Sequence, residues 1–181
     1  MSSFTFYDAT IVPALSAFKT MDHILHEAEK HPDAATFPTA RLAEDMYPLT
    51  YQIHISSKLT EQMVARLTGR EAANFEDNLS SYEEMHERIA TILKILDAED
   101  KGIVNRVAEK VEATTIGPLN TEMSNWGYSA AFIIPNIFFH LTIAYAILRG
   151  KGVPLGKKDY LKEFLTPHLP ESAGRPWQKK A

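Results

Sequence analysis

Apolar residues recur every three to four positions along four stretches of this chain, which is the spacing of amphipathic helices. The first predicted helix begins at Asp8 or Thr10 and ends before Pro32. A loop over residues 32–41 follows, because its prolines and other turn formers carry no apolar period. The second predicted helix follows this loop and ends at Gly69, since glycine adopts the left-handed conformation of a helix cap at the least cost.

Two further long helices are predicted in the second half of the chain. Ser80 and Ser81 each have a glutamate three residues later, which is the pattern of a capping box, and the helix that follows continues to Asp97. The fourth helix begins at Asn125 and ends near Gly150. Four long helices joined by loops predict an all-α four-helix bundle.

The segments around the fourth helix have a different character. Residues 101–124 mix β-branched residues with Gly117-Pro118, which predicts a short extended excursion or a hairpin and leaves the detailed conformation open. Lys157 to Leu165 is predicted as a short C-terminal helix. We therefore expect one helical-bundle domain over residues 1–165 and a mobile, proline-containing tail over residues 166–181.

Composition narrows the compartment and the class of partner. The chain has no cysteine, which excludes disulfides, thiolate metal sites and a cysteine nucleophile, and which fits a reducing compartment. We therefore expect a cytoplasmic protein. The formal net charge is -4 and the basic residues are scattered among acids, so we expect neither a nucleic-acid nor a membrane partner.

The fourth predicted helix is unusually apolar. No residue from Asn125 to Leu148 carries a full charge at neutral pH, and the stretch is long enough to cross the ~30 Å hydrocarbon core of a bilayer. It also contains Asn136, His140 and Pro135, and polar side chains are expensive in lipid. Because a helix that is apolar on all sides is typically surrounded by protein, we interpret this stretch as the central helix of the bundle.

Polar groups on a buried helix are informative, because an unpartnered amide or imidazole away from water costs about 1 to 3 kcal/mol. Asn136 and His140 are four residues apart and therefore share a face, directly after Pro135, which removes a helix hydrogen bond. Tyr145 and Arg149 form a second such pair, rotated away from the first. The pattern predicts a polar spot beside a proline kink.

The second predicted helix offers partners for this spot. Arg41, Asp45 and Gln52 fall on one stripe if that helix begins soon after the loop, and they would meet the fourth helix if the two pack together. The first functional hypothesis is an internal small-molecule pocket in which His140 transfers a proton near pH 7. The expected site consists of His140, Asn136 and Tyr145 as catalytic residues and of Asp45, Gln52, His54, Phe138, Phe139 and Arg149 as pocket or network residues.

A second hypothesis needs no substrate. The same polar groups would then fix the register of the helices in a protein whose purpose is association, with a homodimer as the expected assembly. Neither hypothesis calls for a cofactor.

Three segments resemble a helical family of unknown function, catalogued under the number nineteen-ninety-three, within the DinB-like superfamily. They are ARLAEDMYPLTYQ (Ala40 to Gln52), FEDN (Phe75 to Asn78) with Tyr82 to Ile89, and PNIFFHLTIAYAILRGKGVPLGKKDYL (Pro135 to Leu161). The resemblance implies an up-down-down-up four-helix bundle with a short C-terminal helix, often dimeric in that superfamily. It implies no established activity.

The wider superfamily typically binds a divalent metal through three histidines, one on the second helix and an HxxxH pair on the last. This sequence has Asn136 in place of the first histidine of the pair, and a carboxamide is a poor ligand for zinc or nickel. Three residues, His54, His140 and Asp45, remain a weak alternative set of ligands, which would make the protein a divalent-metal-dependent transferase. The other histidines are interpreted as solvated or capping residues.

Overall fold

The structure is a computed structural model that describes residues 4–170, and the chain there is mostly helical with one two-stranded hairpin. Three short helices of other types, η1, η2 and η3, span Ala34–Thr36, Gly127–Ile133 and Thr166–His168. The remaining elements are α1 (Phe6–Glu29), α2 (Leu49–Thr68), α3 (Tyr82–Asp97), α4 (Lys101–Arg106), β1 (Val111–Ile116), β2 (Leu119–Ser124), α5 (Ile134–Gly150) and α6 (Lys157–Leu165).

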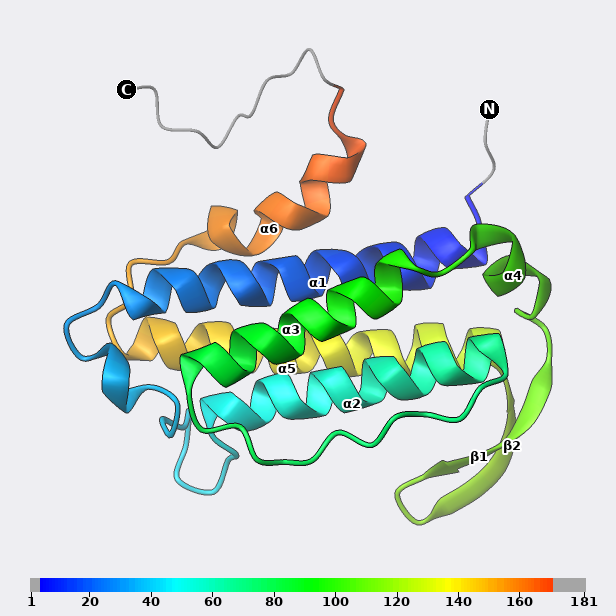
Figure 1. The fold of residues 1–181 in the computed structure, drawn as a ribbon, viewed down its shortest axis with the longest axis horizontal. Helices are drawn as coiled ribbons and strands as arrows, with labels where there is room; N and C mark the ends of the chain where they lie inside the picture. Colours follow the sequence, from blue (N-terminus) through cyan, green and yellow to red (C-terminus); the bar gives the residue numbers. More distant parts are fainter. Residues whose placement is uncertain (1–3, 171–181) are drawn as a thin grey trace.

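Four long helices lie side by side around a common core (Figure 1). α1 and α2 each pack against both α3 and α5, and α6 lies along the outside of α1. In Figure 1, α1 and α5 run in one direction and α2 and α3 in the other. The helical class predicted from periodicity is confirmed, although the hairpin means that the chain is not purely α. The largest fully buried side chains are Phe18, Phe37, Ile11, Met21, Ile24, Leu25, Leu49, Ile53, Met63, Leu67, Met85 and Ile89.

The first helix begins earlier than predicted. Thr5 is the N-cap, and its backbone N–H donates to the carboxylate of Asp8 at 3.0 Å, so that Asp8 lies inside the first turn instead of before it. Pro13 is therefore an interior residue of α1. The C-terminus of α2 and the bounds of α3 and α6 agree with the predictions: Gly69 has φ +69°, and Ser81 accepts a hydrogen bond from the backbone N–H of Glu84.

The second helix begins later than the predicted stripe requires. Arg41 and Asp45 lie in an exposed loop, and α2 starts only after Pro48. A proline disfavours helical conformation in the residue before it, so the helix cannot extend back through Tyr47. The backbone N–H of Leu49 instead donates to Ala40 O at 2.9 Å. The expectation that Arg41, Asp45 and Gln52 share one helix face is wrong for this reason.

The predicted excursion is a helical turn followed by a hairpin. α4 occupies the first residues of this segment, and the two strands then pair antiparallel with Ile116 opposite Leu119. Gly117 has φ +56°, which only glycine adopts readily, and Pro118 completes the two-residue turn. The hairpin extends from the end of the bundle where α2 ends (Figure 1).

The apolar fourth helix is only partly covered. It begins with a π-helical segment, and within residues 4–170 it is the one helix long and apolar enough, by length and composition, to span a membrane. Such a helix is weak evidence for a span, because core helices of soluble proteins pass the same test. Its most apolar window is 39% buried, so the expectation of a helix surrounded on all sides is wrong: α1 and α2 cover two sides, while Pro135 and Phe139 are exposed.

Candidate functional site at the seam of α2 and α5

The packing of α2 against α5 brings His140 and Gln52 together. His140 Nδ1 lies 2.8 Å from Gln52 Oε1, across 88 residues of sequence. Both side chains occupy the seam between the two helices, where Gln52 is 2% exposed and His140 is half-buried. The two residues that the sequence placed on separate helices therefore form one polar pair.

Gln52 is held in a single orientation by the start of its own helix. Its Nε2 donates to Tyr47 O at 3.0 Å and to Pro48 O at 3.1 Å. Because Nε2 faces two carbonyl groups, Oε1 is the atom presented to the imidazole, and His140 Nδ1–H must donate to it. The carbonyl groups of Tyr47 and Pro48, just before α2, thus fix the orientation of the Gln52 amide and through it the tautomer of His140.

Burial lowers the pKa of His140 from 6.5 to about 4. The imidazole is therefore neutral near pH 7, with its proton on Nδ1 and a lone pair on Nε2. A general base works best when its pKa lies near the working pH. The neutral ring is suited to accept a hydrogen bond at Nε2, and the expectation that His140 moves a proton near pH 7 stays a prediction.

Exposed aromatic side chains lie beside His140 and just before the start of α2. The ring of Phe139 lies edge-on to His140, with centroids 5.2 Å apart, and is 55% exposed. At the start of α2, Tyr47 is 60% exposed and stacks on Tyr51 at a centroid distance of 4.0 Å. The seam thus combines one oriented imidazole with the exposed ring of Phe139, and α5 carries no charged side chain before Arg149.

Three other predicted residues lie elsewhere on α5. Tyr145 and Phe138 face α6, where their rings contact Tyr160 and Phe164 edge-on. Arg149 is exposed at the helix end, and its Nη1 donates to Val153 O at 2.9 Å. The reason is rotational: five residues separate Tyr145 from His140, which turns it to a different face of the helix.

Asn136 does remain on the His140 side of the helix, yet its amide is satisfied locally. Its Nδ2 donates to Phe132 O at 2.7 Å, one turn back in the π-helical segment. Asn136 therefore stabilises the backbone beside Pro135, where a helix N–H is missing.

The alternative metal set is not brought together. Asp45 is exposed in the loop before α2, and His54 lies on another face of α2, where its ring contacts Tyr51 and burial lowers its pKa. Within residues 4–170, one group of three histidine or carboxylate residues has its ligand atoms within 4.8 Å of one another. This group does not include Asp45, His54 or His140. We therefore do not place a metal at this seam.

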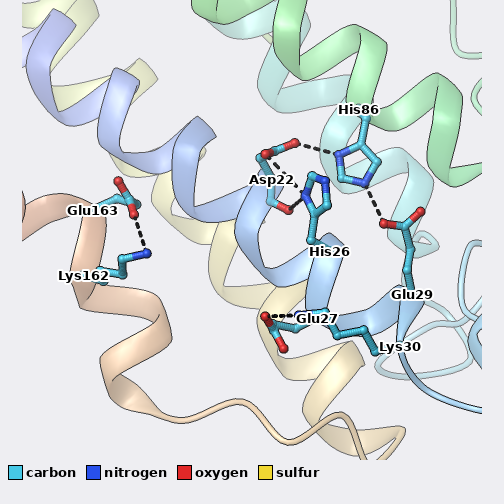
Figure 2. Close-up of polar contacts among 8 residues, drawn as sticks. All are labelled: Asp22, His26, Glu27, Glu29, Lys30, His86, Lys162 and Glu163. Carbon is cyan, nitrogen blue, oxygen red and sulfur yellow. Dashed lines mark hydrogen bonds and ion pairs between the residues drawn. The ribbon is translucent and has the colours of Figure 1, made fainter. Parts of the chain in front are cut away.

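That group is a second polar cluster, at the contact between α1 and α3, and sequence reasoning missed it (Figure 2). It contains Asp22 and His26 from α1 and His86 from α3, with Glu29 beside them. His86 Nδ1 lies 2.6 Å from Asp22 Oδ1, and His86 Nε2 lies 3.2 Å from Glu29 Oε2. The available signal was the spacing of Asp22, His26 and Glu29, which places all three on one face of α1.

A third polar site joins the hairpin to the bundle. A cavity of about 340 Å³ lies between α2 and β1, and Arg66 and Arg70 are among the residues that line it. Both guanidinium groups are already engaged by the protein, Arg66 with the hairpin and Arg70 with Glu61. This cavity is therefore a structural junction and a poor candidate for anion binding.

Comparison with known proteins gives the family. Residues 6–161 match the family described as Domain of unknown function (DUF1993). The chain belongs to this family. A crystal structure of a DinB family member protein from Shewanella denitrificans is similar, with a TM-score of 0.77 and 31% sequence identity over 86% of this chain and 90% of that chain. No curated protein matches.

Membership of the DUF1993 family confirms the family resemblance and supplies no activity. The DinB-like relative supports the helical fold of residues 4–170 described above. The expected homodimer, the small-molecule ligand and the cytoplasmic location stay predictions.

Proposed function

We propose that this DUF1993 protein, with the up-down-down-up connectivity of a DinB-like bundle, binds a small uncharged molecule at the seam of α2 and α5. The ligand would have an aromatic or apolar part and a hydroxyl or N–H group that donates to His140 Nε2. The observation that carries the proposal is the hydrogen bond from His140 Nδ1 to Gln52, because it fixes which ring nitrogen is left to accept.

Two further features support this choice of ligand. Within residues 4–170, His140 Nε2 forms no hydrogen bond with another protein atom, and this nitrogen is not fully buried. It is therefore open to a ligand or to solvent. Phe139 adds exposed aromatic surface beside the imidazole. Binding sites for small molecules typically combine such apolar walls with a few oriented polar groups.

The proposal is tested by replacing His140 with glutamine. We expect a panel of small phenols and anilines to yield probes that bind the wild type. In His140→Gln the dissociation constant of these probes, measured by calorimetry, should rise about tenfold, because that factor corresponds to the free energy of one hydrogen bond. The glutamine amide cannot both donate to Gln52 and present an acceptor where Nε2 lies. His168→Gln, at an exposed position in η3, is the matched control. Equal affinity of a probe for the wild type and His140→Gln would count against the site.

A further inference from the structure

We propose that the cluster of Asp22, His26, His86 and Glu29 is a divalent transition-metal site that joins α1 to α3. It lies on different helices from the α2–α5 seam and is independent of the ligand proposed there. Asp22, His26 and His86 supply the ligands, and Glu29 orients the ring of His86.

The spacing of the ligand atoms fits one ion. Atoms bound to the same zinc ion at about 2.0 to 2.2 Å lie about 3 to 4.5 Å from one another. One ligand atom each from Asp22, His26 and His86 already lies within 4.8 Å of the other two, and the two imidazole rings have centroids 4.1 Å apart. Small side-chain rotations would therefore complete the coordination, with no movement of the helices.

The backbone prepares this arrangement. Asp22 and His26 are one turn apart on α1, and His26 Nδ1 lies 2.9 Å from Asp22 O, which leaves its other ring nitrogen free to bind an ion. His86 faces them from α3, and its Nδ1 lies beside the Asp22 carboxylate (Figure 2). An ion bound there takes the place of the proton that lies between these two atoms at 2.6 Å, and that proton leaves to solvent.

Glu29 has the position of an outer-shell partner. Its Oε2 lies 3.2 Å from His86 Nε2, the ring nitrogen opposite the one that faces Asp22. A carboxylate on the far nitrogen of a ligating histidine fixes the tautomer and the direction of the ring, and this arrangement recurs in metal sites.

The charge of the cluster also calls for a cation. Within residues 4–170, the ion pairs of Asp22 and Glu29 are formed with histidines only. Of the two lysines shown in Figure 2, Lys30 pairs with Glu27 and Lys162 pairs with Glu163. Asp22 and Glu29 thus bring two carboxylates to the cluster and pair with no lysine or arginine in the described part of the chain, which favours a divalent cation.

The donor set indicates the class of ion. Two imidazole nitrogens and one carboxylate oxygen suit Zn²⁺, Fe²⁺, Co²⁺ or Ni²⁺ better than Ca²⁺ or Mg²⁺, which prefer oxygen ligands. Three protein ligands leave at least one coordination position for water, and the His26 side chain, 56% exposed, places this edge of the site at the surface.

The test uses the full chain, stripped with chelator and titrated with Zn²⁺ and Co²⁺ by calorimetry, with native mass spectrometry for stoichiometry. We expect one ion per chain, a rise in Tm and visible Co²⁺ absorption typical of nitrogen ligation. His26→Ala should weaken binding at least tenfold, and because this side chain is largely exposed the variant should fold normally. Glu29→Gln should weaken binding about 10- to 100-fold, as outer-shell substitutions do.

Two controls make the result specific. His168→Ala should bind as the wild type does, and so should His140→Gln, which separates this cluster from the α2–α5 seam. Absence of binding to the stripped wild type at high micromolar Zn²⁺ and Co²⁺ would overturn the proposal. Unchanged affinity in both His26→Ala and His86→Ala, or loss of binding in His140→Gln, would overturn it as well.

Discussion

Replacing Arg66 with alanine is expected to lower the free energy of unfolding by about 3 kcal/mol, because several charge-assisted hydrogen bonds are lost together. Arg66 Nε donates to Asn125 Oδ1 at 2.6 Å, Nη1 donates to Thr114 Oγ1 at 2.6 Å, and Nη2 donates to Met123 O at 2.5 Å. The guanidinium also lies 4.5 Å from the ring centroid of Tyr128. One α2 side chain thus ties both strands and the start of the apolar helix to the bundle.

Chemical denaturation measures the loss, and hydrogen exchange locates it. The backbone amides of the hairpin should exchange faster in Arg66→Ala than in the wild type. The amides of α1 and α3 should still exchange only through global unfolding, as they do in the wild type. Arg66→Lys should lose most of the same free energy, since an ammonium group cannot bridge these acceptors from one plane. Arg106→Ala, at an exposed position in α4, is the control. A loss below about 0.5 kcal/mol in Arg66→Ala, as for an ordinary surface site, would contradict this account.

Replacing Glu61 with alanine should cost about 2 to 3 kcal/mol, somewhat less than for a fully buried ion pair because the side chain of Arg70 is 39% exposed. Glu61 is 1% exposed and accepts hydrogen bonds from both terminal nitrogens of Arg70 and from the backbone N–H of Ala73 at 2.7 Å. These contacts hold the start of the long connection between α2 and α3. Its removal takes the shared acceptor away from the Arg70 guanidinium and from the backbone N–H of Ala73.

The same contacts set a pH dependence. Burial acts to raise the pKa of Glu61, but the hydrogen bonds from Arg70 and Ala73 outweigh it and leave the pKa below the ordinary 4.5. A carboxyl group with a lowered pKa stabilises the fold above its unfolded value, and this stabilisation is lost as the pH falls through the folded value. The stability difference between the wild type and Glu61→Gln should therefore shrink below pH 4.5. A constant stability difference between the wild type and Glu61→Gln across this pH range would argue against the pair.

The hydrophobic periodicity of the sequence was sufficient to predict that the long helices exist, but it could not predict which helices pack against each other. The bounds of α3 and α6 follow from local signals, a capping box for α3 and a short amphipathic stretch for α6. The start of α2 could not be placed from spacing alone, because loop residues with helical spacing precede Pro48. The π-helical segment also leaves no periodic signal, since it adds one residue to a turn.

The candidate sites show the same division. His140 was recognised because polar residues are conspicuous in an apolar helix, and Gln52 because it was placed on a helical stripe. The bond between them depends on helix packing. His86 was interpreted as a solvated residue, because nothing local to α3 shows that Asp22 and His26 face it. Arg66 and Glu61 were missed for a similar reason, since their partners lie 9 to 59 residues away along the chain.

The central claim, that Gln52 holds His140 as a neutral acceptor, is tested most directly by long-range ¹H–¹⁵N spectroscopy of the His140 ring over a pH series. We expect the Nδ1–H tautomer, with no protonation as the pH falls through 6.5 and onset only toward the folded pKa of about 4. In Gln52→Ala the ring should lose its preference for that tautomer. Titration of His140 with a midpoint near 6.5, or an Nε2–H tautomer in the wild type, would contradict the account.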